Sequence, residues 1–306
     1  MSNPAFPSHA RDLRGYGRRP PKFSWPNGAY AAVSLVVNFE EGAELSVSDG
    51  DPSTETVVEV ASVVPQGRWD QGTEQQFAYG SRIGVWRMLD AFATRSYPIT
   101  WYMCGRAVER LPDVAREMVA AGHEAACHGW LWRPHSDYQT PEDERRDLVR
   151  CVQAIERATG QKPLGFFGRG GESAWTRPIL KDLGFEYTSN GFDDDLPYMD
   201  RSANLLVVPY SLDTNDTKFI RPSGFSLTDE FLTYVRESLE VVIEEGKAGA
   251  PKMLNIGFHL RISGRAGRIR AVTKVLGLLD ALGSQVWVAR RIDIARFWMS
   301  EVEARG

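Results

Sequence analysis

The run AAVSLVVNFEEG, residues 31–42, decides the fold class of this 306-residue chain. Its first part, Ala31–Val37, is short, largely apolar and rich in β-branched residues, as is typical of a strand buried on both faces. The polar cluster Asn38–Gly42 follows directly and predicts a loop. The run therefore predicts a buried strand that ends at a polar loop.

Beyond residue 80 the sequence alternates between patterns typical of helices and of strands. Apolar residues recur at helical spacing from Ser81, and short apolar runs bounded by turn residues predict strands. The predicted strands are Ile99–Met103, Glu124–Cys127, Leu164–Phe167, one at Tyr187, Leu205–Val208, Met253–Gly257 and Val286–Val288. The predicted helices are Pro112–Ala121, one that begins after Thr140, Thr176–Leu183, Asp229–Glu245, Ala266–Ala281 and Ile292–Trp298. Such alternation indicates a parallel sheet, and roughly six to eight units that close on themselves form an α/β barrel.

The chain is expected to form a single domain, because no linker, low-complexity tract or internal repeat divides it. We expect an N-terminal arm over residues 1–30 and the barrel over residues 31–306. The aromatic stretch Phe23–Trp25 of the arm is expected to pack against another subunit or across the barrel. Residues 44–77 lack periodicity, which predicts a long surface excursion of the kind that often forms a lid.

The composition favours small-molecule chemistry. The net charge is −4 with acids and bases interspersed, so no basic stripe is present to bind nucleic acid or an anionic membrane. The three cysteines, Cys104, Cys127 and Cys151, have no CxxC spacing and indicate buried thiols in a reducing compartment. No stretch has the apolar length of a signal peptide or a membrane span. We therefore expect a cytoplasmic protein that acts on a small-molecule substrate.

Polar residues that directly follow predicted strands are the candidates for catalysis, because the active site of such a barrel lies at the C-terminal ends of its strands. Four segments meet this criterion: Asn38–Glu44 with Glu40 and Glu41, Cys127–His135 with His128, Trp130 and Trp132, Gly168–Ser173 with Arg169, and Phe258–Arg261 with His259. Both His128 and His259 thus directly follow separate strands, which favours proton transfer over a place in the core.

Each of these segments also has a purely structural interpretation. An acidic loop can bind metal, act as a general base or cap the next element. Core packing explains Trp130 and Trp132 about as well as a pocket wall does. Two histidines four apart on a helix can clamp zinc, but the residue four after His128 is Trp132, and His135 is seven away.

At these four segments the chain resembles the polysaccharide deacetylase superfamily, and it resembles the metal-independent allantoinase branch of that superfamily more closely. Six stretches carry the branch resemblance: Arg11–Gly17, Asn38–Glu44, Tyr79–Arg87, Phe192–Tyr198, Pro209–Asp216 and His259–Arg265. The resemblance implies a distorted (β/α) barrel of the deacetylase type. It also implies a homo-oligomer, for which a tetramer is expected.

The resemblance assigns roles residue by residue. Glu40 matches the metal-binding acid of the deacetylases, and His128 matches their first metal-binding histidine. Arg169 matches the arginine that orients the base, and His259 matches the late histidine that acts as general acid.

Two positions depart from the deacetylase pattern, as they do in the allantoinase branch. Asn38 stands where the general base is expected, and Trp132 stands where the second histidine is expected. One carboxylate and one imidazole make a poor zinc site, so we expect no cofactor; a divalent metal such as zinc, if bound, would use Glu40 and His128. The expected catalytic residues are Glu40, His128, Arg169 and His259, and the expected substrate-binding residues are Asn38, Glu41, Trp130, Trp132 and Asp194.

The leading hypothesis is hydrolysis of a non-peptide C–N bond in a cyclic amide, ureide or imide, as in ureide catabolism. Glu40 or a neighbouring carboxylate would help to deprotonate water, and His128 and Arg169 would polarise the oxyanion. His259 would protonate the departing nitrogen.

Two alternatives stay open. Metal-dependent carbohydrate N-deacetylation would need a third ligand such as His135 or Glu41. A catalytically silent barrel would bind a metabolite or serve as a subunit. The segments around Arg169 and after Trp132 differ locally from the allantoinase branch, so the sequence does not single out allantoin as the substrate.

Overall fold

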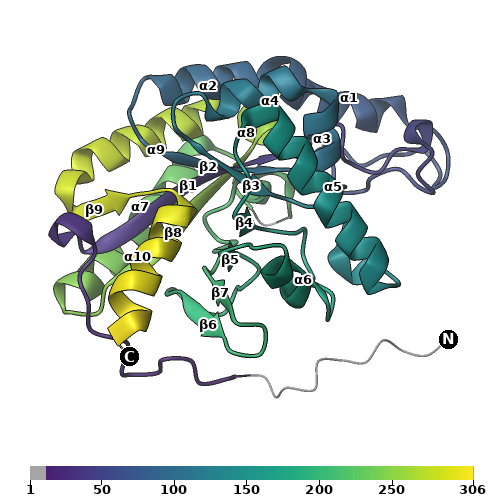
Figure 1. Ribbon diagram of the computed structural model, residues 1–306. Coiled ribbons are helices and arrows are strands. Elements are labelled where there is room, and N and C mark those ends of the chain that lie inside the picture. Colours follow the sequence, from purple (N-terminus) through teal and green to yellow (C-terminus); the bar gives the residue numbers. More distant parts are fainter. Residues whose placement is uncertain (1–11, 223, 306) are drawn as a thin grey trace.

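The predicted sheet is present and is curled into an open barrel (Figure 1). The structure is a computed structural model that describes residues 12–222 and 224–305. Its strands are β1 (Ala31–Phe39), β2 (Ile99–Met103), β3 (Glu124–Cys127), β4 (Gly165–Phe166), β5 (Tyr187–Thr188), β6 (Tyr198–Asp200), β7 (Leu205–Val207), β8 (Lys252–His259) and β9 (Val286–Val288). They form one sheet in the order β6-β7-β5-β4-β3-β2-β1-β8, and β9 also pairs with β1. Every pair is parallel except β6 with β7.

Helices cover the outer face of the sheet, as Figure 1 shows. They are α1 (Gln71–Tyr79), α2 (Val85–Ala93), α3 (Gly105–Arg110), α4 (Pro112–Val119), α5 (Pro141–Thr159), α6 (Thr176–Asp182), α7 (Thr228–Lys247), α8 (Leu260–Ser263), α9 (Ile269–Leu282) and α10 (Arg291–Phe297). Within the described ranges, no helix is both long and apolar enough to cross a bilayer. The alternation of strands and helices confirms the α/β barrel and the single domain.

Three elements differ from the sequence-based expectation. The surface excursion ends earlier than predicted, because α1 begins directly after Asp70, whose carboxylate caps the helix by accepting from the backbone N–H of Thr73. Only Thr73 and Phe77 of α1 are buried, so the helix has no apolar periodicity by which to recognise it. The short helix α3 and the antiparallel strand β6 were also not predicted, since both are too short for periodicity to show.

The register of the central strands brings three predicted site segments to one edge of the sheet. β1 pairs with β8 from Ala31 to Asn38, which lies opposite His259. On the other side of β1, β2 pairs with β3, which ends at Cys127, directly before His128. Since the carboxyl ends of parallel strands share one edge, Asn38, His128 and His259 emerge close together.

The side chain of Asn255 closes the barrel between β7 and β8, because its amide forms the donor and acceptor hydrogen bonds that a backbone peptide group would form. Asn255 of β8 accepts from the backbone N of Ser211 at 2.6 Å and donates to the Ser211 carbonyl at 3.1 Å. Two residues along, the backbone N of Gly257 donates to the carbonyl of Thr214 at 3.0 Å. The segment that follows β7 is thereby fixed against β8, and it delivers Asp216 to the end of that strand.

The described part of the N-terminal arm packs across the end of its own barrel. Phe23 and Trp25 contact each other at 4.8 Å between ring centroids, and both lie against Phe297 of α10. The indole N–H of Trp25 donates to the Lys252 carbonyl at 2.9 Å. The aromatic stretch is therefore covered within one chain, and the expected oligomer stays a prediction. Residues 1–11 of the arm, including Arg11 of the resembling stretch, lie outside the described residues.

The closure by Asn255 predicts a stability effect. Asn255→Ala removes both side-chain hydrogen bonds to the Ser211 backbone in a part-buried seam, so we expect the free energy of unfolding to fall by about 1 kcal/mol or more. Urea unfolding followed by circular dichroism measures this. The matched control is Gln139→Ala, which removes an amide whose one hydrogen bond is exposed and should change stability by less than about 0.5 kcal/mol. Equal stability of the two variants would show that the seam does not depend on Asn255.

Candidate active site

The carboxylate of Glu40 is the centre of a buried cluster of charged side chains. Its Oε1 lies 3.3 Å from Nε2 of His128 and 3.3 Å from Nε2 of His259. Its Oε2 accepts from Nη1 of Arg261 at 2.5 Å. Glu40 is fully buried and the other three side chains are at most 3% exposed, so water does not screen these contacts. The cluster joins the loop after β1 to the ends of β3 and β8.

His259 is held between two carboxylates. Its Nδ1 lies 2.7 Å from Oδ1 of Asp216, and its Nε2 faces Glu40 and lies 2.9 Å from Nδ2 of Asn38. Because a protonated Nε2 and an amide N–H group are both donors, an imidazolium at this position requires the Asn38 amide to turn its Oδ1, which has no other partner among the described residues, toward the ring. Asp216 is itself fixed, because its Oδ2 accepts from the backbone N of His259 at 2.8 Å and from Ser263 at 2.6 Å. Burial by itself lowers the pKa of His259, but the charges of Glu40 and Asp216 outweigh it and raise the pKa to about 9. The ring is therefore an imidazolium at neutral pH.

The acids on the loop after β1 have opposite tendencies. Burial by itself raises the pKa of Glu40, but His259 and Arg261 outweigh it and hold the pKa well below its usual range. Burial raises the pKa of the neighbouring Glu41 to about 7, against the lowering effect of Arg261. Glu41 accepts from the backbone N–H groups of Glu40 and Arg261 at 3.1 Å each. It therefore braces the loop and the start of α8, while Glu40 carries the fixed negative charge.

The orientation of His128 defines which of its nitrogens can exchange a proton. Its Nδ1 contacts the carbonyl of Phe167, which can only accept, so Nδ1 carries a proton. The ring stacks on Phe167 with 5.4 Å between centroids. Nε2, the other ring nitrogen, lies 3.3 Å from Oε1 of Glu40, within hydrogen-bond distance of that carboxylate.

Two aromatic rings cover this cluster. The guanidinium carbon of Arg261 lies 4.3 Å from the ring centroid of Phe77 and 4.9 Å from that of Trp132. Trp132, predicted as a substrate-binding residue, is thus brought to the site. Asn38 and Glu41, also predicted as substrate-binding residues, lie beside His259 and Arg261.

Arg169, by contrast, is not brought into contact with Glu40. Its guanidinium forms two hydrogen bonds with the carboxylate of Glu55, at 2.6 and 2.9 Å, and donates to the Trp132 carbonyl at 3.0 Å. It also lies 3.9 Å from the centroid of the Trp132 ring. Arg169 therefore ties the excursion after β1, which carries Glu55, to Trp132. In this geometry Arg169 reaches the site through Trp132, and its catalytic role stays a prediction.

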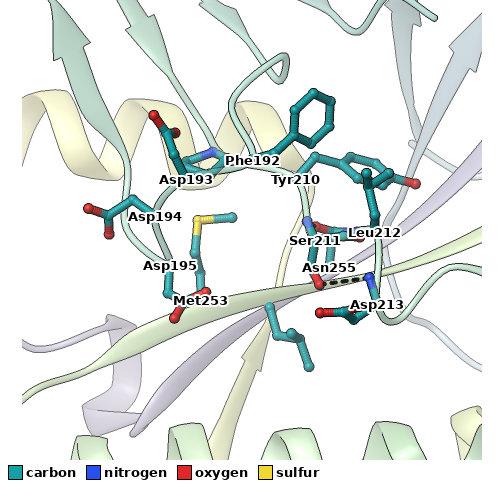
Figure 2. Close-up of a pocket in the computed structure, with 12 residues that line it drawn as sticks. Phe192, Asp193, Asp194, Asp195, Tyr210, Ser211, Leu212, Asp213, Met253 and Asn255 are labelled. Carbon is teal, nitrogen blue, oxygen red and sulfur yellow. Dashed lines mark hydrogen bonds between the residues drawn. The ribbon is translucent and has the colours of Figure 1, made fainter. Parts of the chain in front are cut away.

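Two predicted substrate-binding residues lie elsewhere. Trp130 packs under the guanidinium of Arg150 at 3.6 Å, and its ring fills the space that a side chain at Gly105 would need. Asp194 lines a cavity of about 320 Å³ between β7 and β8, together with Asp193, Asp195, Tyr210 and Asn255 (Figure 2). The carbonyl of its neighbour Asp195 accepts from Met253 near the start of β8, roughly 20 Å along the strand from His259. Neither residue reaches the Glu40 cluster.

The sequence patterns assigned no role to Arg261 and Asp216, which complete the cluster, or to Glu55, which binds Arg169. Arg261 and Asp216 lie in stretches that were singled out, and each directly follows a strand or faces one, but nothing in their spacing shows that they converge on Glu40 and His259. Glu55 lies in the aperiodic excursion and carries no sequence signal. Only the fold brings these side chains to the site.

Comparison with known proteins identifies the family. Residues 69–188 match the family model described as polysaccharide deacetylase. A Schizosaccharomyces pombe protein assigned to the polysaccharide deacetylases is 36% identical, over 95% of this chain and 97% of its own. The chain belongs to the polysaccharide deacetylase family.

Two solved structures are also similar to this deacetylase-family protein. One is a Pseudomonas aeruginosa protein assigned to the same family, with 40% identity, a TM-score of 0.90 and coverage of 96% of this chain and 99% of the other. The second is PuuE allantoinase, with 39% identity, a TM-score of 0.90 and coverage of 96% and 98%. These likenesses confirm the recognised family, including its allantoinase-like branch.

The metal that the wider family implies does not fit these side chains. Trp132 supplies no ligand, and the guanidinium of Arg261 already binds Oε2 of Glu40 and places a fixed positive charge beside the carboxylate. His135, the proposed third ligand, has its Nδ1 bound to Glu144 at 2.8 Å. In the part of the chain that the structure describes, no three His, Cys, Asp or Glu side chains are grouped so that they could hold one ion.

The raised pKa of His259 can be measured directly. We expect the ring carbon resonances of His259 to titrate near pH 9 in a protein with ¹³C-labelled histidine, and Asp216→Asn to lower that midpoint because it removes one of the two carboxylates. The stability gained from this ion pairing is full below the ordinary pKa of 6.5 and is lost as the pH rises through about 9. His123 is the internal control, since burial lowers its pKa. A His259 midpoint at or below 6.5 would contradict the imidazolium assignment.

Proposed function

We propose that this protein hydrolyses the C–N bond of a small cyclic amide or ureide without a metal ion. The observation that carries the proposal is the buried Glu40 carboxylate, whose Oε1 lies 3.3 Å from Nε2 of both His128 and His259. Its relatives are named for deacetylation and for allantoin hydrolysis. Both reactions cut a non-peptide C–N bond, which supports the reaction class.

The two histidines divide the proton transfers. Water adds to the ring carbonyl carbon, and Nε2 of His128 takes its proton. The negative charge of Glu40 stabilises the His128 imidazolium that forms, while the proton on Nδ1 remains on the Phe167 carbonyl. His259 then gives its Nε2 proton to the departing nitrogen as the C–N bond breaks. Glu40 thus acts through charge, which its low pKa favours over a role as the base.

The enclosure of the site favours a small ring over a polymer. Glu40, His128 and His259 are almost wholly buried, and Phe77 and Trp132 cover their neighbour Arg261. A polysaccharide chain needs an open groove that extends beyond the reacting sugar. In addition, the strained or activated amide of a ring demands less electrostatic stabilisation than an N-acetyl group, which suits a site that works without a metal.

Metal-dependent N-deacetylation is the second candidate, favoured by the family model and by the fungal relative. It requires a side chain to leave its present partner and complete a metal site with Glu40 and His128. A catalytically silent barrel is the third, but such a protein has no need of two buried imidazoles that both lie 3.3 Å from one carboxylate oxygen.

A hydrolysis screen separates these functions. We expect turnover of allantoin, of a hydantoin or of a cyclic imide, none of chitooligosaccharides, and unchanged turnover after treatment with a chelator. Product release measured by chromatography, before and after chelation, provides the test. Deacetylation of chitooligosaccharides that is abolished by chelator and restored by zinc would overturn the proposal.

The histidine roles predict a distinct pattern in three variants. His259→Ala and His128→Ala should each lower turnover by about 10²-fold or more, because a proton donor or acceptor is lost at the reacting atoms. His123→Ala should leave turnover near that of the wild type, since His123 lies before β3 and its carbonyl bonds Gln161. Turnover and melting temperature are measured for all three. Near wild-type turnover in His259→Ala would remove the general-acid assignment.

A further inference from the structure

Arg261 has two unused hydrogen-bond donors in the interior of the protein. Its Nη1 donates to Glu40, but Nε and Nη2 are buried and have no hydrogen-bond partner among the described residues. A guanidinium is charged at every accessible pH, and unpaired N–H groups are costly inside a protein. Buried polar groups without a partner are rare and call for an explanation.

The unpaired nitrogens form the edge of the guanidinium that suits two adjacent oxygens. The same Nε–Nη2 edge of Arg290 binds the carboxylate of Asp293 at 2.8 and 2.7 Å, and that of Arg296 binds Glu186 at 2.9 and 2.7 Å. In these two arginines that edge binds both oxygens of one carboxylate. On Arg261 it is empty.

The other fully buried arginine shows that burial alone does not leave donors unpaired. Arg291 donates from Nε to Ser189 at 3.0 Å, from Nη1 to Ser34 at 3.2 Å and from Nη2 to the Pro209 carbonyl at 2.6 Å. Each of its side-chain nitrogens has a partner within the barrel. The vacant edge is thus particular to the arginine that contacts Glu40.

The surroundings of Arg261 hold its guanidinium in place. Phe77 and Trp132 lie 4.3 and 4.9 Å from it, and Glu40 fixes Nη1. A donor edge that is fixed in a region free of water interacts strongly with negative charge and needs no reorganisation during a reaction.

We propose that the Nε–Nη2 edge of Arg261 binds the two oxygens on the reacting carbon, first in the tetrahedral intermediate and then in the product carboxylate. This inference rests on the proposed ring hydrolysis and names the group that stabilises its oxyanion. The predicted oxyanion donors are His128 and Arg169, of which Arg169 is bound to Glu55. Arg261 is then a catalytic residue, since it touches the reacting atoms.

The proton and electron balance is complete without a co-reactant. Water forms a C–O bond to the carbonyl carbon as its proton passes to His128. The π electron pair of the carbonyl group moves onto the carbonyl oxygen, which faces the Nε–Nη2 edge of Arg261. The electron pair on the oxyanion re-forms the carbonyl bond as the C–N bond breaks, and the leaving nitrogen takes the proton of His259. The new carboxylic acid loses its proton to the vacant nitrogen of His259, and His128 releases its proton to solvent. The product is a carboxylate that still carries the freed nitrogen on the same molecule.

Arg261→Lys tests the proposal, because lysine keeps the charge beside Glu40 but lacks the two-pronged edge. With hydantoin as substrate, we expect kcat to fall by about 10²-fold or more and KM to change less. Calorimetry with N-carbamoylglycine, the ring-opened carboxylate, should show binding at least about tenfold weaker than to the wild type. The affinity for N-carbamoylglycinamide, which has no carboxylate, should be the same in both proteins. Arg296→Lys is the control and should match the wild type in every measurement.

A second variant distinguishes loss of the guanidinium from misfolding. Arg261→Ala should regain part of its kcat when ethylguanidinium is added, whereas Arg296→Ala should not respond. Carboxylate affinity equal to that of the wild type in Arg261→Lys, or a loss of kcat that ethylguanidinium does not restore in folded Arg261→Ala, would overturn the inference. Wild-type protein that hydrolyses none of the rings but binds N-carbamoylglycine through Arg261 would overturn the proposed function and leave this binding edge standing.

Discussion

The structure depends on the compensation of one buried negative charge. Glu40 has no contact with water, and an isolated carboxylate in such a place is strongly unfavourable. Arg261 and the imidazolium of His259 neutralise it, and Asp216 in turn balances and orients His259. These residues come from the loop after β1, the end of β8 and the segment that closes the barrel. The register of the sheet therefore has to be correct for the charges to be compatible with folding.

The same compensation determines what chemistry is available. A metal ion would supply a movable Lewis acid, whereas here the positive charges are organic and fixed. Arg261 remains charged through any proton transfer, and His259 can give its proton away and take it back. A site of this composition separates the two tasks, with one cation that holds charge and one that carries a proton. That division suits an activated ring amide, whose leaving nitrogen needs a proton more than its carbonyl needs a metal.

The excursion after β1 connects this chemistry to the surface. Glu55 pairs with Arg169, and Glu59 pairs with Arg268 at 2.7 Å, so the excursion is tied to loops on both sides of the barrel mouth. Arg169 also holds Trp132, which covers Arg261. The predicted lid thus has a physical basis in ion pairs. The acidic cavity of Asp194, in contrast, lies at the other end of β8 and has no contact with this system.

The sequence by itself determined the α/β alternation, most strand positions, the family, and the placement of Glu40, His128 and His259 at the C-terminal ends of strands, although His259 is the last residue of β8 and does not follow it. These features are local, because the burial of a strand and the polarity of the residue at its end depend on consecutive residues of the sequence. Only the tertiary structure decided that Arg261 and Asp216 complete the site, that Arg169 binds Glu55, and that Trp130 packs against Arg150. A long side chain can reach several partners from one backbone position. Which partner it takes depends on strand register and barrel closure, and these are set by contacts between residues far apart in the chain.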